Sequence, residues 1–163
     1  MVESGIEVAV PPNLVYHEVG RERVAVYLHR DNPVATLSQA QLKDLFTGKV
    51  RNWKELGGLD LPVKVFLSSA GSATRSIVQR QLLDGGDFAA DATEFRTGLA
   101  AMAEAGRHRG GIAASGLVLL DAAKGGSIKV AQTPVIERSN GFVTVGKPGE
   151  AAQKVLDFLR RKK

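Results

Sequence analysis

The chain contains segments with two different spacings of apolar residues. Short turn segments separate one segment from the next. Apolar residues that alternate with polar ones, or form short buried runs, predict β-strands. Strands are expected at residues 5–10, 22–29, 62–67, 127–131 and 141–145, with the start of a further buried strand at Gly110-Gly111-Ile112-Ala113. Pro11 and Pro12 stop the first of these strands, and Asp31-Asn32-Pro33 turns the chain after the second.

Apolar positions three and four residues apart predict helices between these strands. Ser38 with Gln41 three residues later forms a capping-box pattern, and Gly48 stands at the expected end of that helix. The pattern further predicts a short turn or helix at 53–56, and helices at 73–83, 94–105, 117–123 (short) and 150–161. Strands that alternate with helices indicate an α/β fold in which helices flank a mixed sheet.

The length of 163 residues fits one compact domain over 1–163, with enough apolar residues, 44%, for a sizeable core. The chain has no cysteine, which excludes disulfides, thiolate metal sites and a cysteine nucleophile. Residues 1–10 lack the basic and apolar regions of a signal peptide. We therefore expect either a cytoplasmic protein or an exported one whose leader has been removed.

A formal net charge of +5 suits anionic ligands. The basic residues are not interleaved with aromatics, so nucleic-acid binding is not expected. His17, His29 and His108 lack metal-ligand spacing, and Trp53 is interpreted as a packing anchor. No known catalytic or cofactor motif occurs, so we expect neither an enzyme nor a metal or cofactor site. A small hydrolase would need a serine and a histidine within hydrogen-bond reach.

The strongest candidate site is the loop that joins the 62–67 strand to the next helix. Free N–H groups at the start of a helix, together with hydroxyl donors, form an anion-binding site. The expected ligand-binding residues are Ser68, Ser69, Gly71, Ser72, Ala73, Thr74 and Arg75. The alternative is that Ser72 only caps the helix, which is the commonest use of serine at this position. Arg75 either adds positive charge to the site or points to solvent.

Residues 24–75 resemble the second lobe of the phosphate-binding receptors of ABC transporters, which have the type II periplasmic-binding-protein fold. The resemblance rests on Asp31-Asn32-Pro33-Val34, Leu37-Ser38, Thr47-Gly48-Lys49, Asn52-Trp53 and Ser72-Ala73-Thr74-Arg75, in that order. Downstream, Gly110-Gly111-Ile112-Ala113 and residues 141–145 with the last helix are similar to the closing elements of the family. The resemblance implies a non-enzymatic solute-binding domain for phosphate or a similar oxyanion.

This chain departs from the family pattern in two places. The first lobe of the family, with its Ser/Thr-rich helix start and an acidic residue, has no counterpart in the roughly twenty residues before the strand at 22–29. Ser68 stands where the family has an arginine, and Ala73 replaces a glycine at a point of close backbone approach. The resemblance implies a periplasmic or otherwise exported protein that works with an ABC permease or a sensor.

The departures leave a second function open. A module that retains the fold without binding a ligand would use its surface for a protein partner. A lone lobe exposes the face that normally packs at the cleft, which favours a homodimer or another partner. Oxyanion binding and light scattering distinguish the two functions.

Overall fold

The computed structural model describes residues 13–117 and 126–161. The strand predicted at 5–10 lies outside these residues. The short helix predicted at 117–123 also lies outside them, except for Leu117. The elements are β1 (Leu14–His29), α1 (Gln39–Phe46), a 3-10 helix (Trp53–Leu56), β2 (Lys64–Ser68), α2 (Ala73–Leu82), β3 (Thr93–Phe95), α3 (Gly98–Arg107), β4 (Gly111–Gly116), β5 (Ile128–Val130), β6 (Ile136–Val145) and α4 (Glu150–Arg161).

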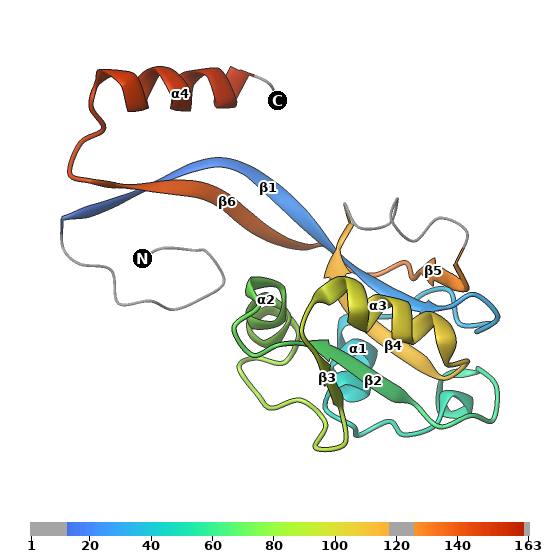
Figure 1. Cartoon of the computed structure of the whole chain (residues 1–163). Coiled ribbons are helices and arrows are strands. Elements are labelled where there is room, and N and C mark those ends of the chain that lie inside the picture. The colour runs from blue at the N-terminus through green and yellow to red at the C-terminus, as the bar shows by residue number, and fades with distance from the viewer. Residues whose placement is uncertain (1–12, 118–125, 162–163) are drawn as a thin grey trace.

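The described strands form one mixed sheet in the order β3-β2-β4-β1-β5, with β6 also paired to β1. β2 is parallel to β3 and β4, whereas β1 is antiparallel to β4, β5 and β6. This is the predicted α/β architecture, a mixed sheet flanked by helices (Figure 1). Because β2, β3 and β4 are parallel, their carboxyl ends meet at one edge of the sheet.

The sheet is buried on both faces in its central part. Val24, Val26 and Leu28 of β1 belong to a core cluster that also contains apolar side chains of α1 and α2. Ala25 and Tyr27, which alternate with them, pack with Met102 of α3 on the opposite face. Burial on both faces explains why this part of β1 is a continuous apolar run rather than an alternating pattern.

Capping residues fix the ends of the early helices as the sequence predicted. The Ser38 hydroxyl accepts from the Gln41 amide at 3.2 Å, and the Gln41 side chain accepts from the Ser38 amide at 2.9 Å. Gly48, with φ of 75°, follows the C-cap of α1. Gly57, with φ of 77°, ends the 3-10 helix in the left-handed region, where glycine is strain-free.

The prediction of a helix over 94–105 was wrong at its start. Residues 93–95 form β3, which pairs with β2, and α3 begins only at Gly98 with Thr97 as N-cap. Apolar spacing does not distinguish such a short edge strand from the first turn of a helix. α3 ends at Arg107, within two residues of the predicted end at 105.

β1 and β6 extend beyond the core as a long two-stranded ribbon, which the sequence predicted only in part. Their pairing runs from Leu14 opposite Val145 to Val24 opposite Ile136, with a bulge between Glu18 and Gly20. Figure 1 shows the ribbon leaving the helix-covered part of the sheet and α4 lying along its far portion. The predicted strands at 22–29 and 141–145 are thus the ends of two longer strands.

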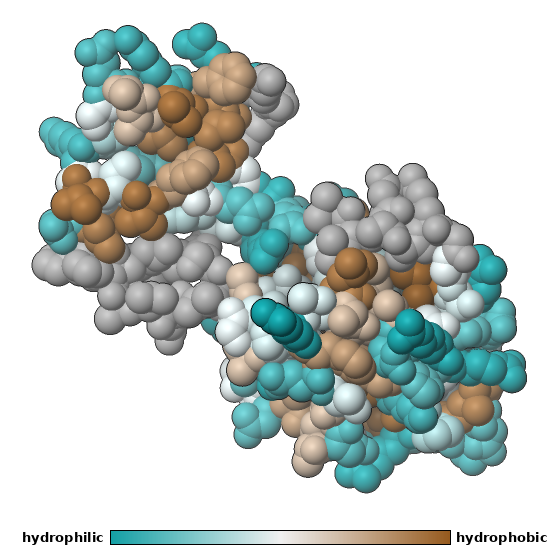
Figure 2. Space-filling model, viewed as in Figure 1, coloured by the Kyte–Doolittle hydropathy of each residue, from teal (hydrophilic) through white to brown (hydrophobic). Residues whose placement is uncertain are grey.

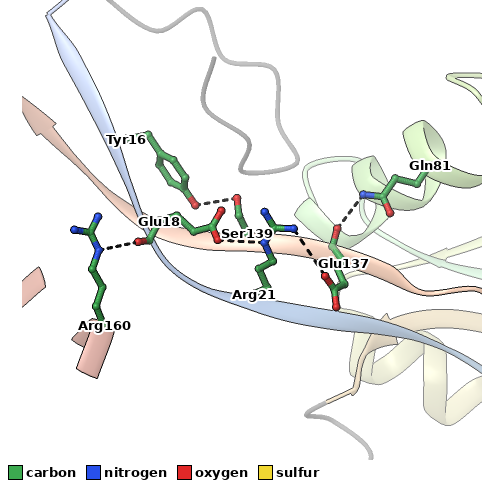
Figure 3. A network of polar contacts seen from close by, with 7 residues as sticks. All are labelled: Tyr16, Glu18, Arg21, Gln81, Glu137, Ser139 and Arg160. Atoms are coloured by element: carbon green, nitrogen blue, oxygen red, sulfur yellow. Dashed lines mark hydrogen bonds and ion pairs between the residues drawn. The ribbon is translucent and has the colours of Figure 1, made fainter. Parts of the chain in front are cut away.

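Polar contacts hold the ribbon to the core and to α4 (Figure 3). Gln81 of α2 donates to the Glu137 carbonyl of β6 at 2.9 Å, and Arg160 of α4 donates to the Glu18 carbonyl at the bulge at 3.3 Å. Across the ribbon, Tyr16 donates to Ser139 at 3.1 Å. Of these contacts, the one from Gln81 joins the ribbon to the core, and the one from Arg160 joins it to α4.

The far half of the ribbon and α4 expose apolar side chains. Phe142, Val145, Val155 and Phe158 are each more than half exposed. Along α4 the apolar side chain of Leu156 is buried, whereas Val155 is 54% exposed. Figure 2 shows the apolar residues gathered on this part of the molecule.

Tyr27 gives the core a pH dependence at alkaline pH. Its hydroxyl donates to the Gly116 carbonyl at 2.9 Å. Burial, with a smaller contribution from the charge of Glu22, raises the pKa of Tyr27 to about 12. In the unfolded chain a tyrosine titrates near pH ~10. The stability that the neutral phenol contributes is therefore complete below about pH 10 and is lost as the pH rises through about 12.

We expect the free energy of unfolding to fall between these two pH values in urea titrations. Tyr27→Phe should remove the part of this pH dependence of the unfolding free energy that Tyr27 contributes. At neutral pH the lost hydrogen bond should lower the unfolding free energy by about 1 kcal/mol. Tyr16→Phe is the matched control, because Tyr16 lies on the ribbon. An unchanged slope in Tyr27→Phe would contradict the prediction.

Candidate functional site

The candidate loop lies at the carboxyl edge of the parallel strands, where open α/β sheets bind ligands. β2 ends at Ser68, the loop crosses Ser69 to Ser72, and α2 begins at Ala73. The Ser72 amide donates to the Ser69 carbonyl at 2.9 Å, which closes the loop as a tight turn. The adjacent ends of β3 and β4 bring the N-cap of α3, Thr97, and Ser115 to the same edge.

Ser72 is the N-cap residue of α2, but its hydroxyl makes no capping hydrogen bond. The hydroxyls of Ser38 and Thr97, by contrast, cap α1 and α3. The alternative in which Ser72 only caps its helix therefore does not hold. The Ser72 hydroxyl therefore forms no capping hydrogen bond with the first amides of α2.

The structure places the other predicted site residues at different depths. Ser68 is 3% exposed and Thr74 is 7% exposed, so both are buried. Ser69, Ser72 and Ala73 are half-buried, and Gly71 is exposed. A Cβ on Gly71 would have no heavy atom within 4 Å, so the loop is open to solvent at this point.

Arg75 turns back toward β2 instead of pointing to solvent. Its guanidinium donates to the Ser68 carbonyl at 3.0 Å and pairs with Glu94 of β3. Its Cζ lies 5.3 Å from the centroid of the Phe88 ring. The hydrogen bond from Arg75 holds the pKa of Glu94 below its usual range. The charge of Arg75 is thus already shared with a carboxylate.

A second arginine, Arg138 of β6, reaches the start of α2 from the ribbon. One of its terminal nitrogens lies 3.5 Å from the Thr74 hydroxyl. Its Nε donates to Glu22 Oε2 at 2.8 Å, and its other terminal nitrogen also pairs with Glu22. Glu22 and Arg138 are directly opposed in the β1–β6 pairing, so the pair is a cross-strand contact.

Both members of this ion pair are mostly shielded from water. The side chain of Arg138 is 24% exposed and that of Glu22 is 16% exposed. The start of α2 therefore brings together helix amides, the half-buried Ser72, the buried hydroxyl of Thr74 and one guanidinium. Neutral donors with one partly neutralised cation are suited to holding a small oxyanion.

Sequence reasoning did not find Arg138 or Glu22. Both lie far along the chain from the Ser68–Arg75 loop, and neither stands in a recognisable motif. Only the pairing of the ribbon strands brings them to α2. The one sequence signal was the strand predicted at 22–29, which contains Glu22 but does not reveal its partner.

His29 and Trp53 have packing roles, whereas His17 and His108 make polar contacts with Thr144 and Glu104. His29 is 8% exposed, and Trp53 is 1% exposed with its indole donating to the Gly110 carbonyl at 2.9 Å. The interpretation of Trp53 as a packing anchor is confirmed. Among residues 13–117 and 126–161, no group of three or more acidic, cysteine or histidine side chains is arranged to hold a metal ion. In the same ranges, no helix is long and apolar enough to cross a membrane.

Comparison with known proteins gives matches over most of the chain. A family model described as a PBP superfamily domain matches residues 4–159. The phosphate-binding protein PstS of Bacillus subtilis is 38% identical over 81 residues, which are 50% of this chain and 27% of that protein. The match thus spans about a quarter of the length of this curated relative.

Two solved structures show how far the likeness of fold extends. An ABC-type phosphate transport receptor from Vibrio cholerae superposes with a TM-score of 0.74 at 19% identity, over 96% of this chain and 70% of the receptor. The regulatory domain of CcmR from Synechocystis PCC6803, in complex with 2-PG, gives a TM-score of 0.61 at 20% identity, over 95% of this chain and 71% of that domain.

Proposed function

The chain belongs to the PBP (periplasmic-binding-protein) superfamily, and from that premise we propose that it binds phosphate or a related oxyanion at the start of α2. The fold is that of a type II receptor lobe, and the 38% identical relative is a phosphate-binding protein. The observation that carries the proposal is the Ser72 hydroxyl, which stands at a helix start without capping it.

In this proposal the oxyanion lies over the first turn of α2. The amides of Ala73 and Thr74 and the hydroxyls of Ser72 and Thr74 donate hydrogen bonds to its oxygens, because the Ser72 amide is already used by the Ser69 carbonyl. Arg138 takes the role of the cation that Ser68 cannot supply, because the guanidinium already reaches Thr74. Ser69 and Gly71 form the open side of the loop through which the ligand enters.

Glu22 limits the positive charge that Arg138 presents. An Arg–Glu pair next to neutral donors holds an anion mainly by hydrogen bonds, so affinity depends on the geometry of the donors more than on net charge. Buried hydrogen bonds of this kind favour a ligand of matching shape over other anions of equal charge. The proposal therefore predicts selectivity among tetrahedral oxyanions.

Isothermal titration with phosphate, sulfate and molybdate tests the proposal. Ser72→Ala should weaken binding of the preferred oxyanion by about 2–10-fold, the effect of one neutral hydrogen bond. The same substitution should leave thermal stability nearly unchanged, because Ser72 caps nothing.

Ser38→Ala is the matched control. Ser38 does cap its helix, so its loss should cost about 1 kcal/mol of stability without changing oxyanion affinity. Absence of heat with all three oxyanions at millimolar concentration would reject the proposal.

The proposal extends to the context of the protein. We infer a non-enzymatic binding domain over residues 1–163. As in the phosphate transport receptor that it resembles, the partner would be an ABC permease, and the compartment would be the periplasm or another exported location. Detection of the protein in a periplasmic extract tests the compartment.

A second candidate function is a ligand-free sensor or protein-interaction module that forms a dimer. Likeness to the CcmR regulatory domain supports it, as does an apolar groove of about 270 Å³ between β6 and α4. The groove is lined by Phe142, Val143, Thr144, Ala152, Val155 and Leu156. Light scattering that gives a strict monomer, together with clear oxyanion binding, would reject this candidate.

A further inference from the structure

A separate cavity lies at the opposite end of β2 from the candidate oxyanion site. Its volume is about 450 Å³, within the range of small-molecule sites. The walls come from the first half of β2, from β3 and from the last turn of α3. They comprise Pro62, Val63, Lys64, Val65, Phe66, Asp91, Thr93, Phe95, Glu104 and His108.

Aromatic rings form the inner wall of this cavity. The rings of Phe66 and His108 stack with centroids 5.4 Å apart, and the Phe95 ring meets Phe66 edge-on at 5.9 Å. Phe66 is 5% exposed, so its ring is part of the core. The wall is therefore rigid and apolar, and suits a ligand with an apolar ring or chain.

Lys64 is the last member of a chain of polar contacts at the rim of the cavity. Arg107 donates to Glu104 at 2.9 Å, and His108 Nε2 lies 3.1 Å from the other oxygen of Glu104. With that ring nitrogen donating to Glu104, His108 Nδ1 accepts from the ammonium of Lys64, 3.4 Å away. The hydrogen bond from Arg107 lowers the pKa of Glu104, so Glu104 stays ionised at neutral pH.

Lys64 and Asp91 are charged groups without a partner of opposite sign. Among the residues that the structure describes, neither forms an ion pair, although surface charges nearby, such as Lys49 with Asp44, do. The Lys64 ammonium is exposed and lies 3.4 Å from His108 Nδ1, so a ligand carboxylate can reach it without displacing an ion pair among the described residues.

We propose that this cavity binds a small zwitterion, an α-amino acid with an apolar side chain, with its carboxylate on Lys64 and its ammonium on Asp91. The side chain of the ligand lies against Phe66 and Phe95. A simple anion would be repelled by Asp91 and a simple cation by Lys64, whereas a zwitterion satisfies both. The site is independent of the proposed oxyanion site, which lies at the other end of β2.

Titration of the full chain with L-phenylalanine, followed by NMR chemical shifts, tests the proposal. Saturable shifts should appear at residues of β2, β3 and the end of α3. 3-Phenylpropionate lacks the ammonium and 2-phenylethylamine lacks the carboxylate, so each should bind at least about tenfold more weakly, the loss of one charged contact. Equal binding by either of these two compounds would overturn the assignment of a zwitterion.

Two variants and a control test which side chains contact the charged groups of the ligand. Lys64→Met and Asp91→Asn should each weaken L-phenylalanine binding by about tenfold or more and leave the thermal unfolding midpoint close to that of the parent. Lys49→Met removes a cation that is paired with Asp44 and should change nothing. The phosphate affinity of the same variants is expected to equal that of the parent protein. Shifts that are absent, or unaffected by Lys64→Met, would overturn the proposal whatever the outcome with phosphate.

Discussion

Trp53→Ala is expected to lower the free energy of unfolding by about 3–5 kcal/mol, the usual cost of removing a buried tryptophan from a core. The side chain is 1% exposed and belongs to the main core cluster. Its indole N–H also donates to the Gly110 carbonyl at 2.9 Å, which ties the 3-10 helix to the residue before β4. Urea unfolding followed by circular dichroism measures the loss without using tryptophan fluorescence.

Trp53→Phe is the control that separates packing from hydrogen bonding. Phenylalanine retains much of the apolar volume and removes only the indole hydrogen bond. The Gly110 carbonyl still accepts from the Lys64 amide at 2.9 Å, so the loss should cost about 0.5–1.5 kcal/mol. The alanine variant should therefore be clearly less stable than the phenylalanine variant. Equal stability of the two variants would mean that packing of the indole contributes little.

The second large effect concerns binding, and it rests on the proposed oxyanion site. Arg138→Met is expected to weaken phosphate binding by about 10–100-fold, since a hydrogen bond to a charged group contributes about 1.5–3 kcal/mol. Arg138 is the only cation that the described contacts bring to the Thr74 hydroxyl. Isothermal titration of parent and variant measures the change.

Loss of Arg138 also leaves the carboxylate of Glu22 without its partner. The double variant Glu22→Gln, Arg138→Met avoids this mostly buried unpaired charge, so it should fold at least as well as the single variant. Arg23→Met is the surface control, because Arg23 is 65% exposed and pairs with Glu137. Phosphate affinity equal to the parent in the double variant would exclude Arg138 from the site.

Local sequence signals were sufficient to predict those features of the fold that depend on residues close together in the chain. The capping box at Ser38 and the glycine that ends its helix, Gly48, both occur where the pattern predicted them. Each depends on contacts within four residues. The two helices at 73–83 and 150–161 were also placed to within a residue, because their apolar spacing is regular.

Short or extended strands were harder to predict. β3 has three residues and packs only at the sheet edge, so it carries too few alternating positions to be distinguished from a helix start. The ribbon halves of β1 and β6 are polar on much of their surface, and their pairing joins residues more than a hundred positions apart. No local pattern specifies such a partner.

The sequence by itself determined the α/β class, the position of the Ser68–Arg75 loop before α2, and the likeness to a receptor lobe, because each depends on periodicity, caps and motif order within short segments. Only the tertiary structure decided that Arg75 turns away to Glu94 and that Arg138 meets Thr74. The physical reason is that charged side chains are positioned by strand pairing and burial, which join distant parts of the chain. The same reason applies to Lys64 and Asp91, which face one cavity only because β2 lies beside β3.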